Sequence, residues 1–182
     1  MSLAKGAQLS KRGSDHIFFV GFLGAGKSTL ARNLGSMFNR RYVDTDRLVE
    51  RRMGMSVTAA FEAHGEQRFR TTETEVLENL AHERSLLVSC GGGIIETPRN
   101  IELMRSQGYT VYLDGDLDDS LRQIRRSDTR PDFGTPAQAA RLLDHRRPLY
   151  REAADLTVDI RGKSFTDVSY AVAELLLEQG LL

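Results

Sequence analysis

The chain has 182 residues, enough for one domain with a sizeable hydrophobic core. Apolar residues make up 40% and charged residues 27%, close to the average of soluble globular proteins. Lys plus Arg equals Asp plus Glu at 25 each, so the net charge is zero. This argues against a protein that binds nucleic acid or a membrane surface through an excess of positive charge. The single cysteine excludes an internal disulfide, so we expect a cytoplasmic protein.

Two features of the sequence bear on domain organisation. Residues 1–15 are small and polar without a signal-peptide pattern, so we expect a disordered tail there. No repeat, low-complexity tract or linker divides residues 16–182, and no run approaches the ~20 apolar residues of a membrane span. We therefore expect residues 16–182 to form a single domain, and we expect a monomer, because no long apolar surface stripe remains after the core is assigned.

Strands and helices alternate along the predicted domain. Short apolar runs predict strands at 16–20, 41–44, 86–90, 110–114 and 156–160. Helical patterns cover 27–38, 46–53, 56–63, 66–83, 100–108, 117–126, 136–153 and 165–180, and Pro, Gly, Asp and Thr mark a loop at 127–136. This alternation is typical of a parallel sheet covered on both faces.

The stretch VGFLGAGKST, residues 20–29, lies between the first predicted strand and the helix that follows. Gly21, Gly26, Lys27 and Ser28 satisfy the pattern G-x-x-x-x-G-K-[ST] in the strand–loop–helix setting that the motif needs. Glycines let successive N–H groups point at phosphate oxygens, and the helix N-terminus adds positive charge. We predict a site for a nucleoside triphosphate, with Lys27 on the β- and γ-phosphates and Ser28 on Mg²⁺.

Two carboxylates, Asp44 and Asp46, follow the second predicted strand. They belong to the strand edge where open α/β sheets bind ligands, and a spacing of two points both side chains the same way in extended backbone. One would hold Mg²⁺ through water, and the other would accept a proton from an attacking hydroxyl. The alternative is that Asp46 only caps the following helix.

Arginines and glycines form the remaining candidate features. Arg70 and Glu73 can pair on one helix, although a solvated surface ion pair explains them equally well. The glycines at 91–93 follow a buried strand and favour a ligand lying against the backbone, or simply an ordinary strand exit. Cys90 is interpreted as a small buried residue.

The loop at 127–136 and the helix after it carry further arginines. Arg125, Arg126 and Arg130 lie in or beside this loop, which would close over the triphosphate and bring charge to the transferred group. A solvated linker is the alternative. Arg146, Arg147 and Arg151 follow; one of them would clamp a carboxylate, unless they form only a charged helix face.

Six segments in order resemble the shikimate kinase family over nearly the whole chain from His16 onward. They are GFLGAGKST, VDTD, VTAAFEAHGEQRFRTTE, CGGGII, TRP and RRPLYREAAD. The resemblance implies an α/β three-layer sandwich of the P-loop nucleoside-monophosphate-kinase type, with a five-stranded parallel sheet flanked by helices. It also implies substrate-binding helices at about 46–82 and a mobile lid at about 126–137.

The function implied by the resemblance is ATP-dependent phosphorylation of the 3-hydroxyl of shikimate, on the route to chorismate and the aromatic amino acids. The catalytic residues it implies are Asp46, Lys27 and Arg130. ATP would be bound by Gly24, Ala25, Gly26, Lys27, Ser28, Thr29, Arg126 and Arg130, with Mg²⁺ on Ser28 and, through water, Asp44. Shikimate would be bound by Asp46, Phe61, Phe69, Arg70, Glu73, Gly91, Gly92, Gly93 and Arg146.

The chain departs from the family pattern in the lid and in the adenine site. The family continues its lid as Arg-Pro-Leu-Leu, whereas this chain reads RPDF and places the acidic Asp132 near the phosphates. Arg161 is near the family's adenine-contacting arginine but out of register, and Arg126 is the better match for an arginine packed on adenine. Two other functions compete: the same fold acting on gluconate, and a nucleotide-binding regulatory module without catalysis.

Overall fold

The computed structural model describes residues 12–124 and 135–182. The strands in these ranges form one parallel sheet in the order β2-β3-β1-β4-β5. They are β1 (His16–Gly21), β2 (Tyr42–Asp44), β3 (Leu87–Ser89), β4 (Gly108–Asp114) and β5 (Leu156–Asp159). The predicted five-stranded parallel sheet is confirmed, with β1 at its centre.

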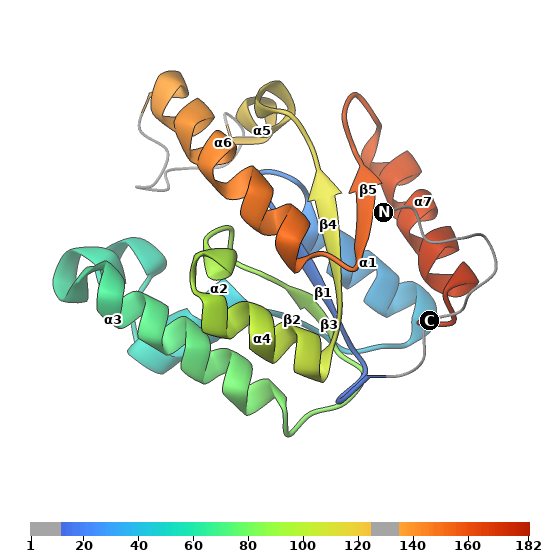
Figure 1. The fold of residues 1–182 in the computed structure, drawn as a ribbon, viewed down its shortest axis with the longest axis horizontal. Helices are drawn as coiled ribbons and strands as arrows, with labels where there is room; N and C mark the ends of the chain where they lie inside the picture. The colour runs from blue at the N-terminus through green and yellow to red at the C-terminus, as the bar shows by residue number, and fades with distance from the viewer. Residues whose placement is uncertain (1–11, 125–134) are drawn as a thin grey trace.

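Helices cover both faces of the sheet (Figure 1). On one face lie α1 (Lys27–Phe38) and α7 (Phe165–Glu178); on the other lie α3 (Val57–Leu80), α4 (Pro98–Gln107) and α6 (Pro136–Ala153). The remaining described helices are α2 (Thr45–Met53), α5 (Leu117–Ile124) and the short 3₁₀ turn η1 (Ile94–Glu96). The result is the three-layer sandwich that the family resemblance implies.

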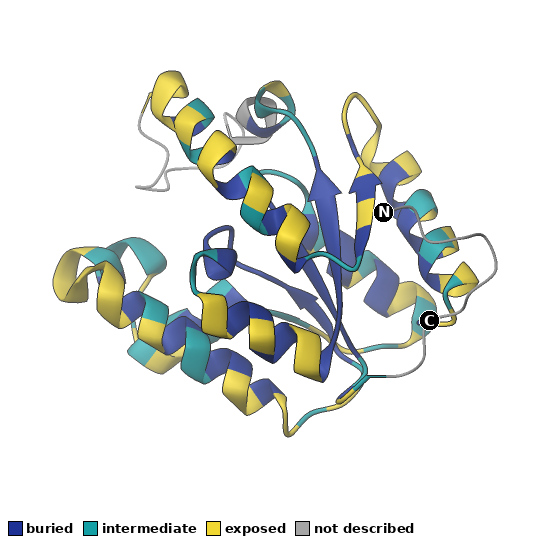
Figure 2. Cartoon of the chain, viewed as in Figure 1, coloured by how far each residue is buried: buried dark blue, intermediate teal, exposed yellow. Residues whose placement is uncertain are grey.

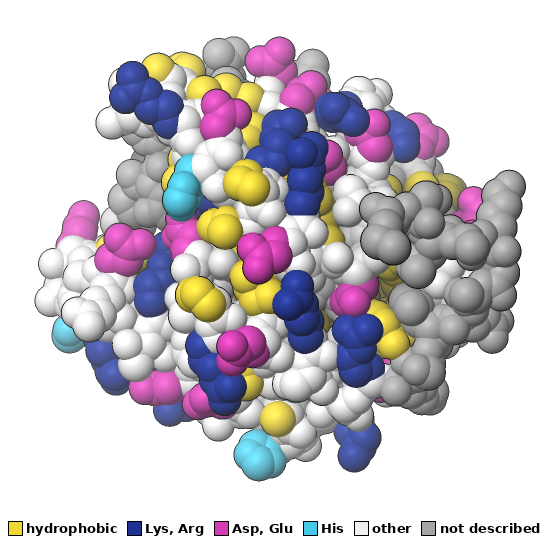
Figure 3. Space-filling model, viewed as in Figure 1, with side chains coloured by type: hydrophobic (Ala, Val, Ile, Leu, Met, Phe, Trp, Pro, Cys, Tyr) yellow, Lys and Arg dark blue, Asp and Glu magenta, His cyan; other side chains and the backbone are white. Residues whose placement is uncertain are grey.

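The core follows from the two-residue period of the strands. In β1, Ile17 and Phe19 pack under α1 and α7, whereas Phe18 and Val20 pack under α3, α4 and α6. Because both faces are covered, the inner strands β1, β3 and β4 are buried along their whole length, whereas the edge strands β2 and β5 are partly exposed (Figure 2). On the face drawn in Figure 3, basic and acidic side chains are interspersed, in keeping with the balanced charge.

The structure refines several predicted boundaries. Residues 12–15 belong to the folded domain and not to a disordered tail: Arg12 pairs with Asp155 at 3.0 Å, and Ser14 Oγ donates to the carbonyl of Ala81. Residues 1–11 lie outside the described residues. The two helices predicted at 56–63 and 66–83 form the single element α3, which is interrupted at Gly65, where φ is 75° and ψ is 169°.

The predicted lid at about 126–137 lies mostly outside the described residues. Its last part belongs to α6, because Thr135 caps that helix: its hydroxyl accepts from the N–H of Gln138, whose side chain accepts from the N–H of Thr135. Pro136 occupies the first turn, a position where its missing N–H costs nothing. Residues 135–137 of the predicted range therefore form the start of α6.

Candidate functional site

The predicted phosphate loop joins β1 to α1. Gly24 and Gly26 have φ of 76° and 81°, a left-handed conformation that favours glycine. Nζ of Lys27 is folded over the loop and donates to the carbonyl oxygens of Gly21 at 2.8 Å and Phe22 at 2.9 Å. The motif thus adopts the strand–loop–helix context that the sequence predicts, with Ala25 inside the loop and Thr29 in the first turn of α1.

A hydroxyl and a carboxylate meet beside this loop. Oγ of Ser28 donates to Oδ2 of Asp44 at 2.6 Å and lies 3.0 Å from Oγ of Ser89. The other oxygen of Asp44 accepts from the N–H of Arg47 at 3.3 Å, which makes Asp44 the cap of α2. The alternative that Asp46 caps this helix is therefore wrong; Asp46 lies in its first turn.

These oxygen ligands fit Mg²⁺ chemically. Mg²⁺ prefers oxygen ligands and is held by one or two protein groups together with waters and substrate phosphates. Ser28 and Asp44 supply such a pair next to the phosphate loop. Within residues 12–124 and 135–182, no group of three or more His, Cys, Asp or Glu side chains is arranged to hold a metal ion.

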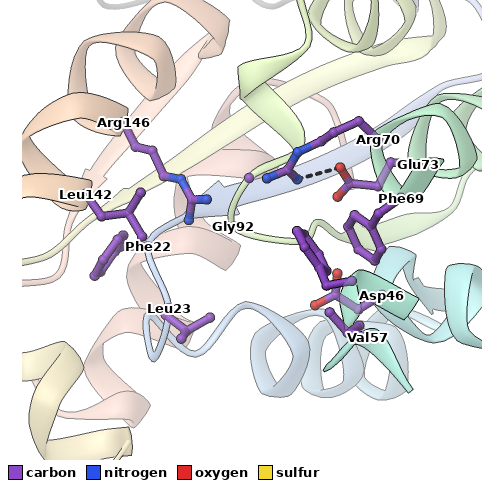
Figure 4. A pocket seen from close by; sticks show the side chains of 12 residues that line it. Phe22, Leu23, Asp46, Val57, Phe69, Arg70, Glu73, Gly92, Leu142 and Arg146 are labelled. Atoms are coloured by element: carbon purple, nitrogen blue, oxygen red, sulfur yellow. Dashed lines mark hydrogen bonds and ion pairs between the residues drawn. The ribbon is translucent and has the colours of Figure 1, made fainter. Parts of the chain in front are cut away.

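A pocket opens beside the phosphate loop, between α2, α3, η1 and α6 (Figure 4). The residues that line it are Phe22, Leu23, Asp46, Val57, Phe61, Phe69, Arg70, Glu73, Gly92, Gly93, Leu142 and Arg146. The rings of Phe61 and Phe69 pack against each other at a tilt of 36°, with centroids 4.5 Å apart, and form an apolar wall. Most of the predicted acceptor-binding residues therefore share one cavity, next to the loop residues Phe22 and Leu23.

Arg70 is the most heavily paired side chain of this pocket. Its guanidinium donates to Glu73 at 2.7 Å, to Glu96 at 2.8 Å and to Glu66 at 3.2 Å, and it lies within 6 Å of both phenylalanine rings. The alternative of a solvated surface ion pair is wrong, because the Glu73 side chain is only 1% exposed. Burial by itself lowers the pKa of Arg70, but the surrounding carboxylates raise it above its usual value.

Glu73 has a perturbed acidity. Burial disfavours its charged form and raises its pKa to about 7, although the Arg70 guanidinium acts in the opposite direction. The nearby carboxylate of Asp46 raises the pKa further, and Arg146 lowers it. The pocket therefore contains a carboxyl group that gains or loses a proton near neutral pH.

Arg146 reaches the pocket from α6. Its side chain is 6% exposed, so the interpretation as part of a solvated helix face is wrong for this residue. Its Nε and Nη2 donate to the two oxygens of Glu96 at 3.2 and 3.3 Å. Arg151 does fit that interpretation: it is exposed and lies 3.6 Å from Asp114.

The glycine triplet allows these charged groups to approach the backbone. A Cβ on Gly91 would overlap Oδ1 of Asp46, and a Cβ on Gly93 would lie 2.5 Å from Nη2 of Arg70. The N–H of Gly91 donates to Oγ1 of Thr45 at 2.8 Å, which ties the triplet to α2. An ordinary strand exit would not require glycines at these positions.

Several residues at the site escaped the sequence prediction. Glu96 contacts both arginines, Ser89 lies beside Ser28, and Tyr150 Oη donates to the carbonyl of Gly92 at 2.6 Å. The only sequence feature that could have indicated them is their position next to the recognised motifs.

Cys90 is buried, as expected, and burial raises its thiol pKa. Arg126 and Arg130 lie outside the described residues.

The glycine loop between β1 and α1 and the strand order of the sheet place the chain among the P-loop kinases of small molecules. The family model described as shikimate kinase matches residues 23–177. The chain therefore belongs to the shikimate kinase family. This membership makes it an ATP-dependent kinase of the aromatic biosynthetic pathway.

Individual relatives agree with this assignment. A shikimate kinase of Dehalococcoides mccartyi is 35% identical over 89% of this chain and 93% of its own length. One from Halorhodospira halophila is 36% identical over 92% of this chain and 97% of its own. The solved structure of shikimate kinase from Acinetobacter baumannii in complex with shikimate aligns with a TM-score of 0.84 and 35% identity, covering 92% of this chain and 95% of that one.

Proposed function

We propose that the chain transfers the γ-phosphoryl group of ATP to the 3-hydroxyl of shikimate, giving shikimate 3-phosphate and ADP. The observation that carries this proposal is the convergence of Arg70 and Arg146 with Asp46 in one pocket next to the phosphate loop. Shikimate is a carboxylate with several hydroxyls. It needs guanidinium donors at one end and a carboxylate acceptor at the other, as this pocket supplies.

On the nucleotide side, backbone N–H groups of Gly24, Ala25 and Gly26 would bind the phosphates, with Thr29 contributing from the first turn of α1. Lys27 would exchange its two carbonyl partners for the β- and γ-phosphates. The predicted roles of Arg126 and Arg130 in binding ATP and stabilising the transferred group remain part of this proposal.

Mg²⁺ would be held by Ser28 directly and by Asp44 through water, with the nucleotide completing its coordination. When bound, the ion neutralises charge that develops on the phosphates during transfer. The hydrogen bond that Ser28 donates to Asp44 shows that the two groups already lie together.

On the acceptor side, Asp46 would accept the proton of the attacking hydroxyl. Arg70 and Arg146 would bind the carboxylate of shikimate, and Glu73 would hold the Arg70 guanidinium in place through their 2.7 Å contact. The three glycines would let the substrate lie against the backbone, and Phe61 and Phe69 would pack on its apolar parts.

The test is ADP release by the purified protein with Mg²⁺ and ATP, measured without acceptor, with shikimate and with gluconate. We expect release that depends on shikimate. Gluconate is also a polyhydroxy carboxylate. ADP release with gluconate instead of shikimate would be compatible with the fold but would overturn the assignment of the pocket. Binding of ATP without acceptor-dependent release would favour a regulatory module.

We also propose a monomeric protein of the cytoplasm. Within the described part of the chain, no helix is long and apolar enough to cross a membrane. The free cysteine is buried, which suits a reducing compartment. Light scattering of the purified protein would test the monomeric state.

A further inference from the structure

Glu96 occupies an unusual position between the two arginines proposed to bind the substrate carboxylate. It is the last residue of η1, just after the glycine triplet. One of its oxygens accepts from Arg70 at 2.8 Å, and both accept from Arg146 at 3.2 and 3.3 Å. Because Arg70 belongs to α3 and Arg146 to α6, this carboxylate bridges two helices that are far apart in the sequence.

The contact uses the donors that an incoming carboxylate needs. A guanidinium binds a carboxylate most strongly through two parallel N–H groups. Arg146 directs its Nε and Nη2, one such pair, at Glu96. The donors of Arg70 are shared among Glu66, Glu73 and Glu96. A substrate carboxylate that binds the Nε–Nη2 pair of Arg146 and Nη2 of Arg70 must therefore take donors that Glu96 holds.

Glu96 differs from the other two carboxylates in a way that suits displacement. Glu73 is 1% exposed, whereas Glu66 is 65% exposed and, of the two arginines, is paired only with Arg70 among the described residues. Glu96 is 20% exposed and, among the described residues, is the carboxylate that contacts both arginines. His145, on the exposed side of α6, lies 3.7 Å from Oε1 of Glu96 and offers a second polar neighbour.

We propose that Glu96 is an internal substitute for the substrate carboxylate, which holds Arg70 and Arg146 in the empty pocket and is displaced when the acceptor binds. This inference rests on the proposed function, in which these arginines bind the substrate carboxylate. Displacement costs part of the binding energy, so Glu96 sets the affinity for the acceptor. It also favours anionic acceptors, because an uncharged polyol has no group that can replace Glu96 on the arginines.

The test is Glu96→Gln, which keeps the size of the side chain and removes its charge. We expect the KM for shikimate to fall by about five- to tenfold, because charge-assisted hydrogen bonds no longer have to be exchanged. The kcat and the KM for ATP should stay within about twofold, because Glu96 contacts neither the phosphate loop nor Asp46 in any interaction described above. Calorimetric titration of shikimate should show the same gain in affinity.

Glu66→Gln is the matched control, since it removes the same charge from the same arginine without breaking the bridge. A comparable fall in KM in both variants would attribute the effect to charge alone and overturn the inference. An increased or unchanged KM in Glu96→Gln would also overturn it, because Glu96 would then position the arginines or play no part. Melting temperatures would confirm that both variants are folded.

The proposed function can fail separately. If the unmodified protein shows no shikimate-dependent ADP release, the proposed function is wrong and the role of Glu96 falls with it. If the unmodified protein is active and Glu96→Gln does not lower the KM for shikimate, only the present inference is wrong.

Discussion

The replacement Gly91→Ala tests whether the glycine triplet exists to let Asp46 approach the backbone. The new Cβ would overlap Oδ1 of Asp46 and would lie 3.2 Å from Oε1 of Glu73. Gly91 does not have a left-handed φ, so the backbone itself tolerates alanine. The steric conflict with Asp46 is therefore the main consequence of the change.

The size of the effect follows from the movement that Asp46 must make. To reach ordinary van der Waals contact, its carboxylate would have to withdraw by about 1 Å, and a displacement of about that size in a catalytic group can reduce the rate by about 100-fold. That factor corresponds to about 2.7 kcal/mol of transition-state stabilisation. Crowding in the buried site would cost about 1–3 kcal/mol of stability, which lowers Tm by about 2–12 °C.

The assay is steady-state ADP release with shikimate, together with ATP affinity and Tm. We expect kcat to fall by about 100-fold and the affinity for ATP to stay unchanged, because the phosphate loop is untouched. Gly92→Ala is the comparison: its Cβ would come no nearer than 3.5 Å, to Nη1 of Arg146, so it should preserve Tm. Because Gly92 lines the acceptor pocket, this change should act on the KM for shikimate and not on kcat. An unchanged kcat in folded Gly91→Ala would refute the reasoning.

Three further changes address the acceptor pocket. Asp46→Asn should preserve the fold and lower kcat by about 100-fold, the scale of losing a general base; normal turnover would exclude that role. Arg70→Ala should raise the KM for shikimate by about 100-fold and leave the KM for ATP within about twofold, since it removes a charged partner of the substrate; equal weakening of both would contradict a substrate clamp. Because Glu73 has a pKa of about 7, it is largely protonated below that pH and adds no negative charge beside the incoming anion. The KM for shikimate should therefore rise as the pH increases from 6 to 8, and a profile in Glu73→Gln as steep as in the unmodified protein would assign the titration to another group.

The phosphate loop could be predicted because its determinants are contiguous. Gly21 to Ser28 lie within one short stretch, and the apolar run before it and the helical pattern after it are local signals. The carboxylates after β2 were harder to assign. Asp44 and Asp46 are two residues apart, and either is a suitable helix cap by residue type. Only the backbone of α2 decides that Asp44 accepts from Arg47.

The acceptor pocket could not be derived from local patterns. Arg70 lies on α3 and Arg146 on α6, and each looks like a surface charge when its own helix is considered alone. Family resemblance was needed to predict that they act together. Glu96 was missed because its partners lie on two other helices, and neither a motif nor a helical spacing connects it to them.

The net charge of the acceptor pocket connects the role of Glu96 with the titration of Glu73. In the empty pocket, Arg70 and the buried Arg146 face Glu73 and Glu96, and these four groups are neutral together when both carboxylates are ionised. Asp46 and the exposed Glu66 add negative charge beside them. An incoming anion adds a negative charge in a place where unpaired charge is costly. The charge balance of the pocket is restored either by protonation of Glu73, which its pKa of about 7 allows, or by movement of Glu96 away from the arginines toward solvent. The pH dependence and the displacement of Glu96 are thus two responses to the same requirement, that two guanidiniums accept one more carboxylate.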